Sequence, residues 1–124
     1  MEHPCCLVFI NDEGLRSQLE EMFQAKEIDC YFIKQGDQLS QLVKNWNPFM
    51  MVIDLSSADS EWIFRHIAGV ELTRPGFPIV ALVSDAQETL RRRAESYGCR
   101  FIFTESEFLE KLPGTVDGIL TKRL

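Results

Sequence analysis

The chain of 124 residues lacks the short motifs that mark most phosphate, metal and nucleophile sites. It contains neither a GxGxxG nor a GxxxxGK[ST] loop, which excludes the two commonest glycine loops for nucleotide phosphates. Its four cysteines include no CxxC pair and its two histidines are far apart, so neither a zinc clasp nor a nucleophilic triad is indicated. We expect the cysteines to be buried free thiols, which behave as small apolar side chains.

Long apolar runs and an excess of positive charge are also missing. No run approaches the roughly 20 apolar residues that span a bilayer, and the start, Met1 to Pro4, lacks the basic segment of a signal peptide. The formal net charge of −6 disfavours direct contact with nucleic acid, because phosphate binding needs clustered cations. We therefore expect a cytoplasmic protein without a membrane or nucleic-acid partner.

What the chain does have is two alternating apolar patterns. Continuous runs rich in Val, Ile and Phe are typical of strands that are covered on both faces. These runs are Cys5–Ile10, Cys30–Ile33, Phe49–Leu55, Phe77–Val83 and Phe101–Phe103. Apolar residues at helical spacing lie between and after them, over Leu15–Phe23, Leu39–Trp46, Trp62–Val70, Leu90–Tyr97 and Phe108–Leu124. This alternation predicts one α/β domain, residues 1–124, with a parallel sheet covered by helices on both faces.

Proline and glycine indicate where the helices end. Pro75-Gly76 should end the third helix, and Gly98 should close the fourth. Pro113-Gly114 interrupts the last apolar stripe. We therefore expect a fifth helix that is short or broken.

Polar residues follow the strands where sites form in open parallel sheets, at the carboxyl ends. The first strand is followed by Asn11 and Asp12, and the third ends in Asp54. If these strands are neighbours, the two aspartates converge on one pocket, where their mutual repulsion favours a bound cation. Mg²⁺ suits such oxygen ligands, and a carboxylate beside it is a candidate phosphoryl acceptor.

Four stretches of the sequence resemble response-regulator receiver domains. They are Val8–Leu15, Pro48–Leu55, Phe77–Ser84 and Gly98–Phe103, which correspond to the ends of the first, third and fourth strands and to the beginning of the fifth. The resemblance covers essentially the whole chain. It implies a flavodoxin-like, doubly wound (βα)5 sandwich with strand order 2-1-3-4-5.

The resemblance also implies a role for each acidic position. Asp54 falls on the phosphoacceptor and Asp12 on the acid that binds Mg²⁺ directly. The backbone carbonyl of Ser56 would be the third protein ligand. Asn11 replaces a second acid, so it would reach the ion only weakly, through water, and Mg²⁺ binding should be weakened.

The positions that carry the family's switch depart from its pattern. The hydroxyl residue that ends the fourth strand falls on Val83, with Ser84 one residue later. The lysine on the fifth strand falls on Thr104, or on Glu105 if the alignment slips by one residue, so neither alignment supplies a cation. Phe101 does match the aromatic position that moves with the switch.

We therefore predict an atypical receiver that is not an enzyme and acts by protein–protein contact, with an impaired or absent phosphorylation switch. Its partner would be a histidine kinase or a downstream signalling protein, bound through the fourth helix, fifth strand and fifth helix, and a homodimer is left open. A conventional Mg²⁺-dependent receiver, phosphorylated on Asp54 by a histidine kinase, with Ser84 and Thr104 as substitutes, is the first alternative. A small flavodoxin-like enzyme or flavin carrier is the second.

Three residue sets also have simpler interpretations. Asp12 can serve as the N-cap of the first helix, a role that aspartate fills well. Asp54 can be no more than a polar residue of the loop that follows its strand. Arg91-Arg92-Arg93 on the fourth helix can be a solvated face rather than a docking patch.

Overall fold

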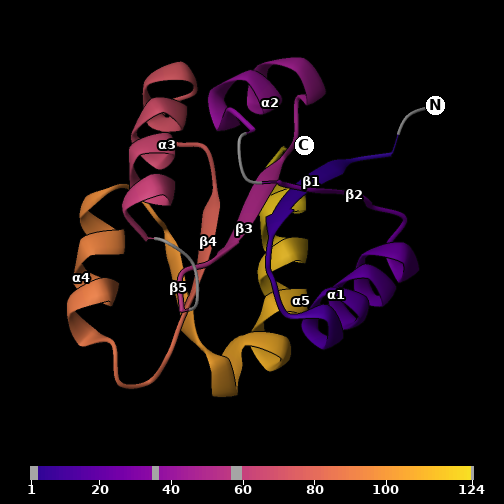
Figure 1. The fold of residues 1–124 in the computed structure, drawn as a ribbon. Helices are drawn as coiled ribbons and strands as arrows, with labels where there is room; N and C mark the ends of the chain where they lie inside the picture. The colour runs from indigo at the N-terminus through magenta and orange to yellow at the C-terminus, as the bar shows by residue number, and fades with distance from the viewer. Residues whose placement is uncertain (1–2, 35–36, 57–59, 124) are drawn as a thin grey trace.

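The computed structural model of the chain describes residues 3–34, 37–56 and 60–123. Strands and helices alternate in strict order, and all neighbouring strands are parallel. The five strands form one sheet in the order β2-β1-β3-β4-β5 (Figure 1). The predicted fold class and strand order are therefore confirmed.

The elements match the predicted runs closely. The strands are β1 (Cys5–Phe9), β2 (Asp29–Phe32), β3 (Met50–Asp54), β4 (Ile79–Val83) and β5 (Phe101–Thr104). The helices are α1 (Glu13–Ala25), α2 (Leu39–Trp46), α3 (Ser60–Thr73), α4 (Glu88–Ser96) and α5 (Glu105–Arg123). Among the described residues, no helix is both long and apolar enough to cross a bilayer.

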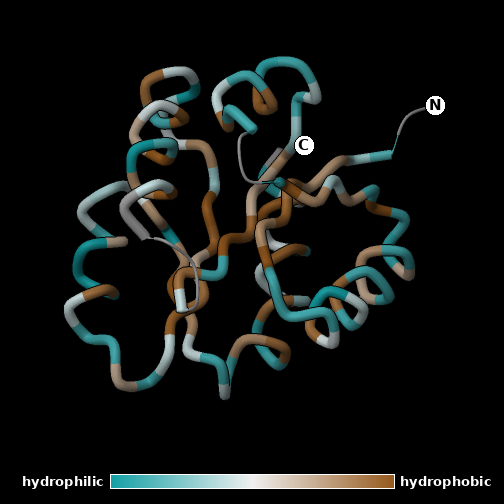
Figure 2. The backbone as a smooth tube through the Cα atoms, viewed as in Figure 1, coloured by the Kyte–Doolittle hydropathy of each residue, from teal (hydrophilic) through white to brown (hydrophobic). Residues whose placement is uncertain are grey.

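The sheet separates two apolar cores, because successive side chains of a strand point to opposite faces. On β3, Met51 and Ile53 pack under α2, α3 and α4, whereas Met50 and Val52 pack under α1 and α5. Strands β3 and β4 lie at the centre and are buried throughout. Figure 2 shows these strands as the most hydrophobic part of the backbone and the helices as mixed. Two-sided burial explains why the strands read as continuous apolar runs.

Local signals begin and end the helices, and Gly98 closes α4 as predicted. Asp12 is the N-cap of α1 and its Oδ1 accepts a hydrogen bond from the backbone N–H of Leu15 at 2.9 Å. Helix α2 ends at Asn47, which has the left-handed φ of 48°. Gly98 follows α4 with a φ of 104°, a conformation that favours glycine, and its N–H donates to the carbonyl of Glu95.

The prediction of a short or broken fifth helix is wrong. Helix α5 runs without interruption from Glu105 to Arg123, with Pro113 inside it. Proline costs the helix one backbone hydrogen bond and tends to kink it, and Figure 1 shows α5 bending after its first turns. Leu112 and Val116 on either side of the proline are fully buried under the sheet, and their burial outweighs the local penalty.

The four cysteines are free thiols, as predicted, but Cys5 and Cys30 are only partly buried. Cys6 and Cys99 are buried in the two cores. Burial raises the pKa of Cys99 to about 12 and raises the pKa of Cys6 well above its ordinary value. Thiols in these surroundings stay protonated and unreactive near neutral pH.

Candidate functional site

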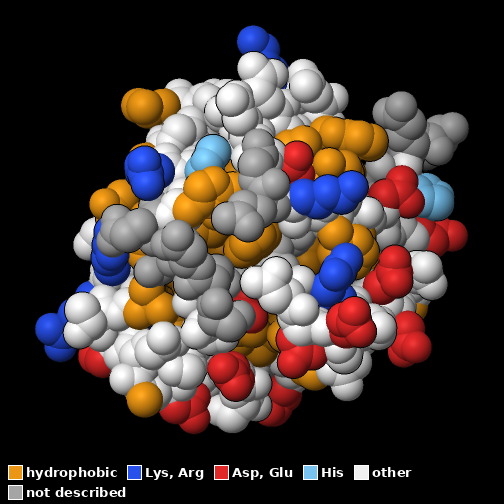
Figure 3. All heavy atoms as spheres, viewed as in Figure 1, with side chains coloured by type: hydrophobic (Ala, Val, Ile, Leu, Met, Phe, Trp, Pro, Cys, Tyr) orange, Lys and Arg blue, Asp and Glu red, His pale blue; other side chains and the backbone are white. Residues whose placement is uncertain are grey.

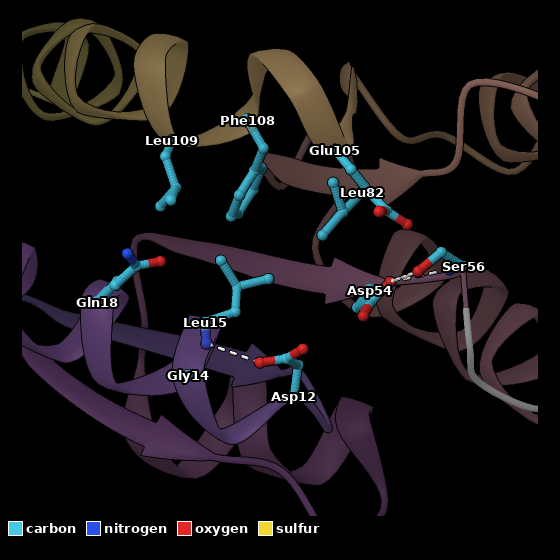
Figure 4. A pocket seen from close by; sticks show the side chains of 10 residues that line it. All are labelled: Asp12, Gly14, Leu15, Gln18, Asp54, Ser56, Leu82, Glu105, Phe108 and Leu109. Carbon is cyan, nitrogen blue, oxygen red and sulfur yellow. Dashed lines mark hydrogen bonds between the residues drawn. The ribbon is translucent and has the colours of Figure 1, made fainter.

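A pocket of about 580 Å³ opens at the carboxyl ends of β1, β3 and β4, between α1 and α5. Figure 4 shows the side chains that line it. They are Asp12, Gly14, Leu15, Gln18, Asp54, Ser56, Leu82, Glu105, Phe108 and Leu109. The structure therefore brings Asp12 and Asp54 to one pocket, as the sequence predicts, and we call it the acid pocket.

Asp54 is the buried polar side chain of the sheet, with 5% of its surface exposed. It ends β3 and shares the face of Met50 and Val52, which turns it toward α1 and α5. Its Oδ1 accepts hydrogen bonds from the backbone N–H of Ser56 at 2.9 Å and from the Ser56 hydroxyl at 2.5 Å. These two bonds anchor the carboxylate to the loop that follows the strand and offset part of the cost of its burial.

Asp12 combines its place in the pocket with a structural task. Its Oδ1 is occupied by the N-cap bond to the backbone of Leu15 (Figure 4), so the simpler interpretation of Asp12 holds alongside any ligand role. Asn11 is exposed and lies outside the described pocket lining. The residue that the resemblance aligns with the family's second acid is thus not among the described residues that line the pocket.

Glu105 supplies a third carboxylate to the acid pocket. It is the first residue of α5, and its side chain reaches toward Asp54 in Figure 4. The ten described lining residues include three acids and neither Lys nor Arg. Figure 3 shows Asp and Glu side chains also gathered along the lower edge of this face, where the strands end.

The two residues that the resemblance aligns with the family's hydroxyl position, at the end of the fourth strand, are not among the described residues that line the acid pocket. Val83 ends β4 and packs fully buried in the core under α2, α3 and α4, on the opposite face from Asp54. Ser84 follows it, and its backbone N–H donates to Oε1 of Gln87 at 2.9 Å. Neither residue is among the described residues of the pocket lining.

Thr104 also has a structural task. The backbone N–H of Thr104 donates to Oε1 of Glu107 at 2.9 Å, and its hydroxyl lies 3.1 Å from that of Ser106. The bond from the N–H of Thr104 to a glutamate three residues later is one of the two hydrogen bonds of a helix capping box. The junction of β5 and α5 thus turns Thr104 into a cap and presents Glu105 to the pocket.

The capping box makes part of the stability depend on pH. The N–H of Thr104, and then the Lys111 side chain, hold the pKa of Glu107 below its ordinary value of 4.5. A carboxylate with a depressed pKa stabilises the fold above its unfolded pKa, and that contribution is lost as the pH falls through the folded pKa. We expect Glu107→Gln to lower the melting temperature at about pH 7 and to have a smaller effect at about pH 3.

Thermal unfolding followed by circular dichroism checks this expectation. Glu110→Gln is the matched control, because Glu110 lies on the same helix and makes no ion pair with a described residue. A difference between wild type and Glu107→Gln that does not shrink at low pH would contradict the capping role.

The arginine run on α4 is divided among three environments. Arg91 is half-buried and lies 3.9 Å from Glu107, while its Nη1 is 3.5 Å from the carbonyl of Ile102. Arg93 covers the ring of Phe64, with 4.5 Å between its guanidinium carbon and the ring centroid. Arg92 is exposed and pairs within the helix. The run is therefore not a uniform cationic patch, and Arg92 alone projects into solvent.

Phe101 begins β5 and packs partly buried against the core under α1 and α5. It lies at the opposite end of its strand from the acid pocket and is not among the pocket's described lining residues. The resemblance assigns it to the family's aromatic switch position, and in the structure it pairs with Val80 of β4, toward the beginning of the sheet.

The acid pocket offers carboxylate oxygens, which are the kind of ligand that Mg²⁺ binds. Mg²⁺ accepts one or two carboxylates and keeps several waters, and Asp12 and Asp54 offer two. No three His, Cys, Asp or Glu side chains among the described residues converge on a common metal position. The resemblance implies that the two aspartates and the Ser56 carbonyl would hold such an ion, which would neutralise part of the negative charge of the pocket.

The sequence alone does not reveal the α5 wall of the pocket. Glu105 enters the sequence argument only as an alternative alignment for a missing lysine, and Phe108 and Leu109 only as members of an apolar stripe. The Thr104-x-x-Glu107 spacing is the signal that could have found this arrangement, because a capping box fixes where α5 begins. With that start known, the side-chain directions of Thr104 and Glu105 follow.

Comparisons with known proteins agree on the fold. No family model matches the chain, and no curated protein matches it in sequence. Among solved structures, a CheY-like protein (TadZ) of Pseudomonas aeruginosa superposes with a TM-score of 0.81 at 15% identity, covering 94% of this chain and 99% of that one. The receiver domain of a Francisella response regulator gives 0.77 at 16% identity, covering 98% and 100%.

A CheY-like response regulator of Mesorhizobium loti is similar to the same degree, with a TM-score of 0.76, 14% identity, and 95% and 99% of the two chains covered. These matches extend over nearly the full length of each chain. At such low identities they show that this chain has the fold of CheY-like receiver domains.

Proposed function

We propose that the chain is an atypical receiver that signals through protein contacts without a phosphoryl switch. The observation that carries this proposal is the acid pocket, which holds Asp12, Asp54 and Glu105 and no Lys or Arg among its described lining residues. The CheY-like fold supports a role in signal transduction. It gives no support to a catalytic role. The residues that depart from the family's pattern support loss of the switch.

Phosphorylation of Asp54 would place further negative charge in a pocket that is already acidic. A phosphorylated Asp54 carries close to two negative charges, and here they would lie beside the Glu105 carboxylate. The family's lysine would supply a charge-assisted hydrogen bond of roughly 1.5–3 kcal/mol at this point. Without that bond the modified state is poorly stabilised.

The residues at the switch positions, Val83 and Thr104, also bear on whether a phosphoryl group could change the conformation. A modification shifts a two-state equilibrium only if it makes different contacts in the two states. Val83 has no hydroxyl and is buried on the far face, and the hydroxyl of Thr104 pairs with Ser106. The chain therefore offers a phosphoryl group little that would favour an active conformation.

We further propose that the partner is a protein, either a histidine kinase or a downstream signalling protein, met in the cytoplasm. The contact face consists of α4, β5 and α5, as the resemblance implies, and a homodimer through this face is the self-association we would test for. Arg92 and Leu109 are exposed on these elements and are available to a partner. Mg²⁺ is the proposed cofactor of the acid pocket, bound weakly because Asn11 stands where the family has a second acid.

A conventional receiver is the second candidate, and the common pocket of Asp12 and Asp54 favours it. It requires Ser84 and Thr104 to act as the missing switch groups, and the Glu107 bond that fixes Thr104 as a cap weighs against this. A flavin carrier is weaker still, because three carboxylates would repel the flavin's phosphate.

The deciding experiment is an amide NMR titration with Mg²⁺ and then with Mg²⁺ plus beryllofluoride, a mimic of a phosphoryl group on aspartate. We expect shifts to be absent or confined to the surroundings of Asp12 and Asp54. Shifts that spread to Phe101 and α4 would support the conventional receiver instead. Stoichiometric phosphorylation of Asp54 with a coupled change in partner affinity would overturn the proposal.

A further inference from the structure

A second hollow lies at the other end of the sheet from the acid pocket. It has a volume of about 730 Å³, within the usual range for small-ligand sites, and forms where β3, β4 and β5 begin and α5 ends. Figure 1 shows the end of α5 beside the beginnings of the strands. The described lining residues are Phe49, Arg74, Pro78, Arg100, Phe101, Phe103, Glu110, Lys111, Gly114, Thr115, Gly118, Ile119 and Lys122. We call this hollow the basal groove.

The interior of the basal groove is apolar. Phe101 and Phe103 of β5 form its floor together with Phe49, which precedes β3. On α5, Gly114 and Gly118 lie four residues apart, so they share one face of the helix. A Cβ added at either glycine would meet nothing within 4 Å. Both glycines are exposed, so the missing side chains leave this side of α5 open to the groove and to solvent.

The charges around the basal groove are mostly positive. Its described lining includes four basic residues and a single acid, Glu110, in a chain whose net charge is −6. Two of these cations are engaged, because Arg74 donates to the carbonyl of Pro48 and Lys111 pairs with Glu107. The other two remain available to a ligand.

Those two cations are Arg100 and Lys122. Neither makes an ion pair or a side-chain hydrogen bond with a described residue. Arg100 precedes β5 and Lys122 lies in the last turn of α5, so the two come from different walls of one apolar groove. Unpaired cations beside aromatic rings match a ligand with an apolar body and a negative group.

We propose that the basal groove binds a small amphipathic anion, an apolar ring or chain that carries one carboxylate or phosphate. The apolar body would lie on Phe101 and Phe103 against the glycine face of α5, and the anionic group between Arg100 and Lys122. The 13 described lining residues are fewer than the roughly 20–30 on each side of a standard protein interface. This binding site is separate from the acid pocket and shares β5 and α5 with the proposed contact face.

The test is an amide NMR titration of the full chain with naphthoate, octanoate and octyl phosphate. The three probes separate ring from chain and carboxylate from phosphate. Naphthalenemethanol and naphthylmethylammonium serve as the neutral and cationic analogues of the ring probe. We expect saturable shifts at Phe101, Phe103, Gly114 and Gly118 with at least one anion, no saturation with the cation, and weaker binding at high salt.

Three variants locate the binding. Gly118→Leu fills the open space of the groove and is expected to abolish the shifts. Arg100→Gln and Lys122→Gln are each expected to weaken binding about threefold, the size typical of an exposed charge pair. Gly69→Leu on α3 is the matched control, because a Cβ at Gly69 also meets nothing within 4 Å and α3 covers the other face. Its binding is expected to equal that of the wild type.

Each outcome of these titrations either supports or overturns the proposal. Saturable binding of an anion that Gly118→Leu removes and Gly69→Leu preserves supports the proposal. Equal binding of the neutral and cationic analogues, shifts that do not saturate, or binding that survives Gly118→Leu would overturn it. Gly118→Leu replaces a helical glycine by a strong helix former, so its thermal transition verifies that it is folded.

Discussion

Replacing Glu105 by lysine is expected to strengthen beryllofluoride binding at Asp54 by about 10- to 150-fold. Glu105 lines the same pocket as Asp54 and projects toward it (Figure 4). The substitution removes a repulsive carboxylate and adds a donor for a charge-assisted hydrogen bond, worth roughly 1.5–3 kcal/mol. The fold-change follows from that range at about 1.4 kcal/mol per factor of ten.

The measurement is an amide NMR titration with beryllofluoride at saturating Mg²⁺, followed at Ser56 and Leu82. Glu110→Lys is the matched control, because it makes the same change of charge on the same helix but outside the described lining of the acid pocket. We expect its beryllofluoride affinity to stay close to that of the wild type.

Thr104→Lys sharpens the test, because Thr104 is the position that the alignment assigns to the family's lysine. In the structure Thr104 ends β5 with its N–H bonded to Glu107, and Glu105 is the residue in the pocket. We expect Thr104→Lys to give little gain. A larger gain from Thr104→Lys than from Glu105→Lys would show that the side chains at this junction lie the other way round in solution.

Replacing Pro113 by alanine is expected to raise the free energy of unfolding by about 1–3 kcal/mol. Proline inside a helix costs about 3 kcal/mol relative to alanine, and Pro113 lies within the continuous helix α5. The lost N–H leaves the carbonyl of Leu109, four residues earlier, without its helical donor. Part of the gain is offset, because proline restricts the unfolded chain by about 0.4–1 kcal/mol.

Urea unfolding followed by circular dichroism measures this change. Gly114→Ala is a useful companion, since a Cβ at Gly114 meets nothing within 4 Å and alanine favours a helix by about 0.8–1 kcal/mol over glycine. If Pro113→Ala instead lowered the stability, the helix would break at Pro113 in solution, as the sequence by itself predicts.

Much of the fold follows from local patterns of the sequence. The continuous apolar runs became the strands because a parallel sheet between two helical layers buries both faces of each strand. Pro75-Gly76 and Gly98 ended α3 and α4 because their backbone requirements are local. Pro113 misled the prediction because its penalty is also local, whereas the burial of Leu112 that outweighs it depends on the whole sheet.

The residues of the acid pocket could likewise be predicted only in part. The convergence of Asp12 and Asp54 could be predicted because carboxyl ends of neighbouring parallel strands meet at one edge of the sheet. The presence of Glu105 could not, because a shift of one residue at the start of α5 reverses which side chain faces the pocket. The capping bond from Thr104 to Glu107 sets that start.

The sequence by itself determined the class of fold, the order of its elements and the edge of the sheet where the aspartates gather, since all three follow from periodicity and chain order. Only the tertiary structure decided that Glu105 lines the acid pocket. It alone placed Arg100 and Lys122 around a second groove. These contacts join residues that are distant in the chain, and their direction depends on how the helices pack on the sheet.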